Sequence, residues 1–371
     1  MVDIQKILKR SWHILWNYRL LWVFGFILAL ALGGTRFSNN SSYRMNDQQN
    51  EPGYNGPTVD GFEELQGDTF AEKWADALRQ LQAGIQKVQA EYPVEFRVVI
   101  SAAITFFIVM LLTGLVVAIL RYVAETSAIR MVDEYEQSGV KVGFRQAWRY
   151  GWSNAAWRVF LVNFVTHLPV LVLFVVLGLV GWWIFSALMS GVEWAIINSA
   201  VAGIGLIFLF IFGTAILMVV LTVLRDIAWR MVVLDGAGVG EALRGAAGLM
   251  RRQWKNVGLV WLVMFGLKIV WGIAFFILVF PLLLVSIFTA LGGVLVAIVP
   301  SLLTAGVAAL LAVPDYWPWI FAAIIGLPFF FVVAFSPIHL VGGWSQIYQS
   351  STWTLTYREM KALETVAAPA A

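Results

Sequence analysis

The chain lacks cysteine and carries few charges, and each shortage excludes a class of protein. Without cysteine, the 371 residues cannot form disulfide bonds, thiolate metal sites or cysteine nucleophiles. Charged residues make up 13% of the sequence, about half the share usual in soluble domains. The 25 basic and 22 acidic residues nearly balance, which argues against a nucleic-acid partner. The 3 histidines lie in separate segments without zinc-binding spacing, so we expect no metal and no cofactor.

Apolar residues are abundant instead. Hydrophobic residues make up 60% of the chain, including 18 Trp and 26 Phe, more than one soluble core of this length can bury. Runs of the length needed to cross a bilayer, about 20 residues, occur at 19–34, 98–120, 158–186, 196–224, 257–288 and 319–345. The sequence therefore predicts an all-α polytopic membrane protein with about six transmembrane helices.

The distribution of charge predicts the orientation. The N-terminus and the connections 121–158 and 225–256 carry more basic than acidic residues, whereas the long connection 35–97 is acidic. Because basic connections stay in the cytoplasm, we expect a multi-pass protein of the cytoplasmic membrane with both termini inside. An alternative is that residues 20–32, followed by Gly33 and Gly34, form a cleaved signal peptide. The well-patterned helix predicted at 3–18 argues against it.

The apolar stretch 289–313 is ambiguous because it contains Gly292, Gly293, Pro300 and Gly306. As a full span it would make seven crossings and place the C-terminus outside. As an outer-leaflet or re-entrant segment it leaves six crossings and a cytoplasmic C-terminus. We favour the second arrangement, because it agrees with an internal repeat.

That repeat is indicated by short motifs. Ala128 to Val132 resembles Ala228 to Val232, and Trp152 to Asn154 resembles Trp254 to Asn256. Related motifs stand near the chain ends, at Trp16-Asn17 and Thr356 to Arg358. We interpret them as three repeats of an amphipathic helix plus a helix pair; duplication for packing alone would explain them equally well. The expected segments are 1–34 (amphipathic helix and first span), 35–97 (outer acidic insertion), 98–133 (second span and extension), 134–235 (second repeat), 236–361 (third repeat) and 362–371 (disordered tail).

An amphipathic helix precedes a span in each repeat. Apolar residues recur every three or four positions, with Trp at the edge of the stripe and cations on the opposite face. This pattern suits the headgroup boundary of an anionic leaflet. The cations expected to contact anionic lipid headgroups are Lys6, Lys9, Arg10, Arg145, Arg149, Arg244, Arg251 and Arg252.

The acidic insertion has two parts. Residues 35–67 are rich in Asn, Ser, Gln, Gly and Pro, which predicts a flexible segment. Residues 69–92 show apolar positions at helical spacing, which predicts an amphipathic helix. Its apolar face could rest on the outer membrane surface, on the mouth of the bundle or on a protein partner.

The motifs together resemble a known group. The opening ILKRSWHILWNYRLLWVFG, the Trp-x-Asn motifs and the closing SSTWTLTYREM resemble uncharacterised bacterial multi-span proteins. That group is similar to the membrane domain attached to some glycerophosphodiester phosphodiesterases. The resemblance implies a six-helix module of the bacterial inner membrane that works near phospholipids. It carries over no catalytic residue, since the soluble phosphodiesterase barrel has no counterpart here.

Lys268 is the exceptional charge within the spans. It lies about 18 Å along the helix axis from Asn256, near the middle of a core about 30 Å thick. A central Lys costs about 2.5–3.5 kcal/mol on insertion scales and is a functional candidate by default. We hypothesise an intramembrane polar site for an anionic headgroup or substrate, formed by Lys268, His167, His339, Asn163, Thr166 and Ser336. The alternative is that each polar group bonds to a local backbone carbonyl or to a neighbouring helix.

Paired intramembrane carboxylates, H-E-x-x-H and G-x-S-x-G are all absent, so we do not expect an enzyme. The sequence favours a non-catalytic membrane module that is lipid-associated or scaffolding. The alternative is a transporter or flippase-like permease for an anionic amphiphile, acting through Lys268.

Overall fold

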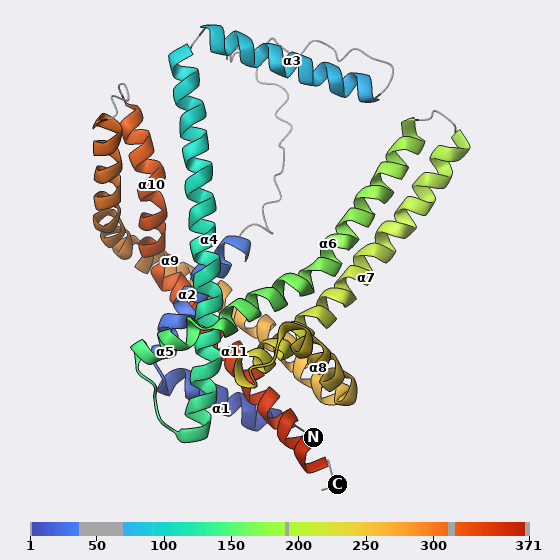
Figure 1. Ribbon diagram of the computed structural model, residues 1–371, viewed down its shortest axis with the longest axis vertical. Helices are drawn as coiled ribbons and strands as arrows, with labels where there is room; N and C mark the ends of the chain where they lie inside the picture. Colours follow the sequence, from blue (N-terminus) through green and yellow to red (C-terminus); the bar gives the residue numbers. More distant parts are fainter. Residues whose placement is uncertain (1, 37–69, 92, 190–192, 311–315, 368–371) are drawn as a thin grey trace. The chain divides into compact units, whose positions relative to one another are not determined.

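The computed structural model describes residues 2–36, 70–91, 93–189, 193–310 and 316–367 (Figure 1). These residues form 11 helices and no strand, so the all-α prediction is confirmed for the described part of the chain. The helices are α1 (Ile4–Asn17), α2 (Leu20–Arg36), α3 (Phe70–Glu91), α4 (Pro93–Ser138), α5 (Phe144–Gly151), α6 (Asn154–Met189), α7 (Glu193–Leu234), α8 (Val239–Arg252), α9 (Trp254–Leu310), α10 (Trp317–Ala334) and α11 (Ser336–Ala367).

Several helices are long and apolar enough to cross a membrane. Among the described residues there are 5, or up to 6 if α1 and the start of α2, bent by 99° at residues 18–19, count as one broken span. The other candidates lie within α4, α6, α7, α9 and α10. The chain is thus a multi-span helical membrane protein, in agreement with the predicted number of crossings.

The chain divides into two compact units. Unit 1 comprises Met1–Gly33, Val116–Thr289 and Phe335–Ala371, and unit 2 comprises Gly34–Leu115 and Ala290–Ala334. The expected insertions 35–97 and 289–313 therefore fall almost wholly into unit 2. The predicted flexible segment 35–67 lies largely outside the described residues.

Two segments are more continuously helical than the sequence suggested. Residues 289–310 continue α9 without a break, giving a helix of 57 residues, while 311–313 lie outside the described part. The tail 362–371, expected to be disordered, is helical as far as Ala367. In this last part of α11, Glu364 forms an ion pair of 2.7 Å with Arg252 of α8.

The core of unit 1 forms where the C-terminal ends of α4 and α7 meet α11. Its buried apolar side chains include Ile129, Met131, Ile227, Ile347 and Met360. Gly139 (φ 71°) and Gly236 (φ 72°) adopt the left-handed conformation directly after α4 and near the end of α7. Glycine permits this conformation without a Cβ clash. Each turn leads into a short amphipathic helix, α5 or α8.

We call α1, α5 and α8 the elbow helices, because each ends in a sharp turn before a longer helix. Asp3 caps α1 by accepting a hydrogen bond of 3.0 Å from the backbone N–H of Lys6. The buried faces of these helices are small or apolar, for example Ile14 and Leu15 of α1 and Ala242 and Ala246 of α8. The middle of each predicted stripe is therefore packed within unit 1, whereas residues at its edge, such as Trp12 and Phe144, stay exposed.

Unit 2 contains a helical hairpin and an amphipathic helix. The end of α9 packs on α10, where the hydroxyl of Ser301 donates a hydrogen bond of 3.1 Å to the carbonyl of Ala322. The helix predicted at 69–92 is present as α3, and its Leu78 and Leu81 are exposed.

Candidate functional site

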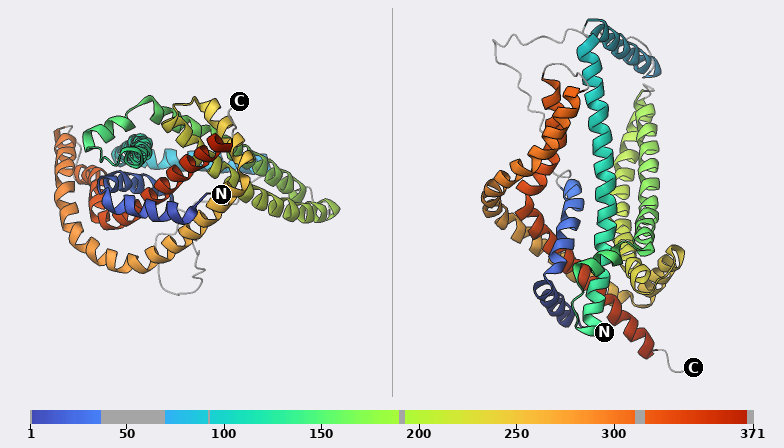
Figure 2. Two further views of the ribbon diagram at one scale, coloured as in Figure 1. Left: turned by 90° about the horizontal axis from the view of Figure 1, so that it is seen from below. Right: turned by 60° about the vertical axis from the view of Figure 1, so that its left-hand side comes forward.

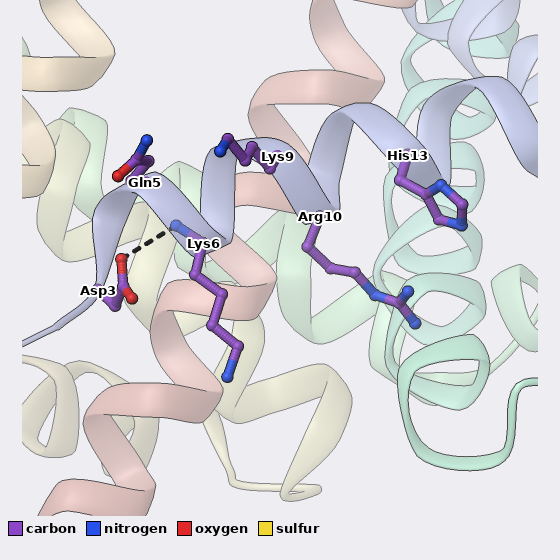
Figure 3. Close-up of a pocket in the computed structure, with 6 residues that line it drawn as sticks. All are labelled: Asp3, Gln5, Lys6, Lys9, Arg10 and His13. Carbon is purple, nitrogen blue, oxygen red and sulfur yellow. Dashed lines mark hydrogen bonds between the residues drawn. The ribbon is translucent and has the colours of Figure 1, made fainter.

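The polar face of the first elbow helix is charged and open. Asp3, Gln5, Lys6, Lys9, Arg10 and His13 line a surface pocket along α1 (Figure 3). Figure 3 shows Lys6 and Lys9 leaving the helix in different directions, while Arg10 extends towards the end of α4. Arg10 makes an ion pair of 2.7 Å with Glu136 of α4. Lys6 and Lys9 are exposed, so they are the cations of α1 that can meet an external anion.

The other predicted headgroup contacts likewise divide into exposed cations and one that is held in an ion pair. Arg145 and Arg149 of α5 and Arg251 of α8 are exposed. Arg244 of α8 is exposed as well, whereas Arg252 is engaged by Glu364. The exposed cations therefore come from all three elbow helices.

Exposed tryptophans accompany these cations. Trp12 and Trp16 of α1 are 48% and 40% exposed and belong to a cluster with Trp22, Trp344 and Tyr348, whose neighbouring ring centroids are 5.1–5.9 Å apart. Trp152, directly after α5, and Trp254, the first residue of α9, are 58% and 66% exposed. Tryptophan concentrates at membrane–water interfaces because it joins a large apolar ring to one polar N–H.

A buried charge network joins α4, α7 and α11 within unit 1. Arg230 is 2% exposed and lies 3.7 Å from Glu125. The hydroxyl of Ser350 donates a hydrogen bond of 2.8 Å to Glu125, and Arg230 donates 2.8 Å and 3.1 Å bonds to the carbonyls of Asp226 and Ser350. We call Glu125, Arg230 and Ser350 the polar core. The Nε of Arg230 finds no partner among the described residues.

The last part of α11 ties several helices together. Arg358 pairs with Asp133 of α4, and Tyr357 and Lys361 both bond to Asp235 at the end of α7. Burial and the hydrogen bond to Asp235 raise the pKa of Tyr357, so its hydroxyl stays protonated and donates. Glu359 accepts a hydrogen bond of 2.9 Å from the backbone N–H of Asp3. The two ends of unit 1 therefore lie together (Figure 2).

Comparison with known proteins identifies a protein family to which the sequence matches. A sequence profile described as a family of unknown function (DUF7544) matches residues 3–350. The chain belongs to this family. No curated protein and no solved structure matches it.

In this DUF7544 chain, three of the predicted intramembrane residues lie together on α6. The amide of Asn163 donates a hydrogen bond of 2.8 Å to the hydroxyl of Tyr122. Thr166 donates to the carbonyls of Val162 and Asn163, and a ring nitrogen of His167 lies 2.6 Å from the Asn163 carbonyl oxygen. Thr166 and His167 thus bond to local backbone carbonyls, and Asn163 bonds to the neighbouring helix α4, as the alternative interpretation expected.

A small cavity adjoins these residues between α6 and α7, the green hairpin of Figure 2. Its volume is about 20 Å³, and its polar lining residues are Thr166, His167, Thr222 and Arg225. Arg225 lies over the ring of Trp229, 4.8 Å from its centroid. The sequence-based hypothesis did not include Thr222 or Arg225.

The other predicted members stand on different helices. His339, on α11, packs edge-on against Phe26 of α2 with centroids 6.1 Å apart. Ser336 is the first residue of α11, and Lys268 is an exposed residue of α9. Among the described residues, no group of three or more His, Asp or Glu side chains is placed to hold a metal ion.

The sequence hypothesis missed the polar core. The motif containing Arg230 was recognised as a repeat marker, but its pairing with Glu125 joins residues on separate helices. A signal was present, because Arg230 and Ser350 lie close after apolar runs where a charge or hydroxyl needs a buried partner.

Proposed function

We propose that this DUF7544 protein is a non-catalytic membrane module whose elbow helices bind the anionic headgroups of the cytoplasmic leaflet. The observation that carries the proposal is the pairing of exposed tryptophans with exposed cations at all three elbows. Trp12 with Lys9, Trp152 with Arg149 and Trp254 with Arg251 are such pairs of near neighbours in the chain. A tryptophan ring can sit at headgroup level while the neighbouring cation meets lipid phosphate.

The proposal includes a topology. The three elbow helices with their following helix pairs are repeats, both chain ends lie in the cytoplasm, and the segment near 289–313 stays at the outer leaflet. Support comes from the ties between α1 and α11, which place both ends of unit 1 together. The resemblance to a membrane domain of glycerophosphodiester phosphodiesterases supports work near phospholipids.

A matched pair of triple variants tests the lipid function. Lys9→Gln, Arg149→Gln and Arg251→Gln together remove one exposed cation from each elbow. The control removes three exposed cations from residues 79–97, namely Arg79→Gln, Lys87→Gln and Arg97→Gln. The lipids retained after purification in mild detergent are quantified by mass spectrometry.

We expect the wild-type protein to retain anionic lipid above its share of the membrane. The elbow variant should lose this enrichment, since each interfacial cation contributes about 1 kcal/mol to binding an anionic surface, and the control should keep it. An equal loss in both variants, or no enrichment in the wild type, would contradict the proposal.

Transport of an anionic amphiphile is the second candidate, and the observation that favours it is Lys268, an exposed cation within the long apolar helix α9. Its test is flux of anionic lipid in proteoliposomes, compared between the wild type and Lys268→Leu. Flux that depends on Lys268 would establish transport, and absence of flux in the wild type would remove this candidate.

A further inference from the structure

A second pocket of unit 1 lies at the bend between α1 and α2. It has a volume of about 540 Å³ and is lined by residues 16–20 together with Lys141 and Val142 of the α4–α5 connection. Two segments far apart in the sequence therefore form one concavity. None of its lining residues was among the headgroup contacts predicted from the sequence.

A buried tyrosine builds this pocket. The hydroxyl of Tyr18 donates a hydrogen bond of 2.8 Å to the carbonyl of Val142, which holds the α4–α5 connection against the bend. Tyr18 is 2% exposed, and its ring lies beside that of Tyr135, with centroids 5.5 Å apart. Burial raises the pKa of Tyr18 to about 12, so the hydroxyl remains a donor at physiological pH. The position of Lys141 beside the bend is thus set by a fixed internal contact.

The charge of the pocket is of one sign. Arg19 and Lys141 line it, and among the residues that the structure describes no acidic side chain does. Arg10 and Arg252 are engaged by glutamates, whereas neither Arg19 nor Lys141 makes an ion pair within the described residues. Both side chains are exposed and available to an anion. Two cations converging from different segments suit a phosphate group, to which Arg presents paired N–H donors and Lys a compact charge.

The rest of the lining indicates where the phosphate comes from. Trp16 and Leu20 provide apolar surface beside the two cations, and Trp16 joins the cluster of exposed tryptophans on α1. A free phosphate ion would gain nothing from this apolar surface, whereas the glycerol and first acyl carbons of a lipid would. The bend itself lies between an amphipathic helix and an apolar one, the junction that sits at headgroup depth in the proposed arrangement.

We propose that the pocket at the α1–α2 bend is a specific binding site for the phosphate of an anionic phospholipid, held by Arg19 and Lys141. This inference rests on the proposed interfacial function and deepens it, because it names one site within a surface that otherwise attracts lipid by charge alone. Tyr18 is a positioning residue, since it acts through the Val142 carbonyl.

The test titrates detergent-purified full-length protein with three probes and counts bound adducts by native mass spectrometry. The probes are dioctanoyl phosphatidylglycerol, dioctanoyl phosphatidylcholine and inorganic phosphate. The pocket variant is Arg19→Gln with Lys141→Gln. The control is Lys6→Gln with Lys9→Gln, which removes the same charge from the neighbouring polar face of α1. Arg19→Lys with Lys141→Arg changes the same two positions but keeps their charge, so it separates the effect of charge from that of substitution at this site.

We expect the first phosphatidylglycerol molecule to bind the wild type more tightly than further phosphatidylglycerol molecules do. In the pocket variant the affinity for this first molecule should fall about tenfold or more. The Lys6 and Lys9 control and the charge-conserving variant should change it less than threefold. Tyr18→Phe should weaken it without removing a charge. Displacement of the lipid by millimolar inorganic phosphate, with phosphate bound equally tightly, would show a free-phosphate site and overturn the lipid assignment.

Equal weakening in the pocket variant and the Lys6 and Lys9 control would overturn the specific site while leaving the general lipid function standing. Equal binding of phosphatidylcholine would overturn the requirement for an anionic lipid at this pocket. Failure of the proposed function is a separate result, namely the absence of any anionic lipid enrichment in the natively purified wild-type protein.

Discussion

The two parts of α7 have opposite surfaces. In its apolar part, Ile204 and Phe208 are 72% and 73% exposed, and none of its most hydropathic window is buried. Near its C-terminal end, Ile227 is fully buried and Arg230 is 2% exposed. One helix thus leaves apolar side chains uncovered and encloses an arginine. The difference teaches that the two parts have different surroundings: lipid for the first and packed protein for the second.

The same contrast holds for α11. Residues 350–357, rich in Ser and Thr, are all buried. Lipid tails are as apolar as leucine, so burying apolar side chains between spans gains little. Stability of unit 1 should therefore depend on the region where α4, α7 and α11 meet, and much less on the exposed apolar part of α7.

The largest effect expected from this difference in surroundings comes from removing one partner of the polar core. Arg230→Leu leaves Glu125 as a buried carboxylate without its cation and should cost about 3–5 kcal/mol. The measurement is thermal unfolding of the detergent-solubilised protein. The control is the double variant Glu125→Leu with Arg230→Leu, which removes both charges and should cost less than Arg230→Leu alone. If the double variant is no more stable than Arg230→Leu alone, the unpaired charge of Glu125 does not cause the loss of stability.

A second prediction compares two isoleucines on α7. Ile227→Ala removes a fully buried side chain and should destabilise unit 1 by about 2–5 kcal/mol. Ile204→Ala removes the same atoms from a side chain that is 72% exposed and should change stability by less than about 0.5 kcal/mol. Equal losses in thermal unfolding would mean that the apolar part of α7 is covered, for instance by another copy or a partner.

The third and smallest effect concerns the contact between α2 and α11. A Cβ on Gly343 would lie 2.7 Å from the carbonyl oxygen of Gly25, so Gly343→Ala forces the two backbones apart. Overpacking of this kind costs about 1–3 kcal/mol. In Gly342→Ala the new Cβ would meet the Cβ of Ala29 at 3.6 Å, an ordinary contact, so this neighbour serves as the control. Unfolding midpoints that coincide for the two variants would refute the close approach.

Patterns within single segments were readable in advance. The amphipathic stripes at 3–18 and 69–92 correspond to α1 and α3. Most of the apolar runs fall within candidate spans, but the run 319–345 is divided between α10, a candidate span, and α11. Residues 289–310 were harder, because glycine and proline indicated an interruption where α9 continues. Glycine lowers helix propensity only by about 1 kcal/mol, which packing overrides. In this helix Gly293 lies beside the Phe330 carbonyl of α10, a close approach that needs a residue without a side chain.

The candidate sites were predicted less completely. The sequence indicated which residues are cationic or polar, but Arg10 and Arg252 are engaged by Glu136 and Glu364 while Lys9 and Arg251 are exposed. Nothing in the local pattern separates these two groups. Likewise, Asn163, Thr166 and His167 share one turn of α6, whereas His339 packs on Phe26 instead.

Composition and periodicity by themselves determined that this chain is helical, spans a membrane several times and carries amphipathic helices beside its spans. These properties depend on residues within one or two helical turns of each other, so a short stretch of sequence is enough to predict them. Tertiary structure alone decided that Glu125 faces Arg230, that Arg358 faces Asp133, and that Lys141 joins Arg19 at the first bend. Those pairings join residues about a hundred or more positions apart, and only the packing of whole helices brings their side chains within reach.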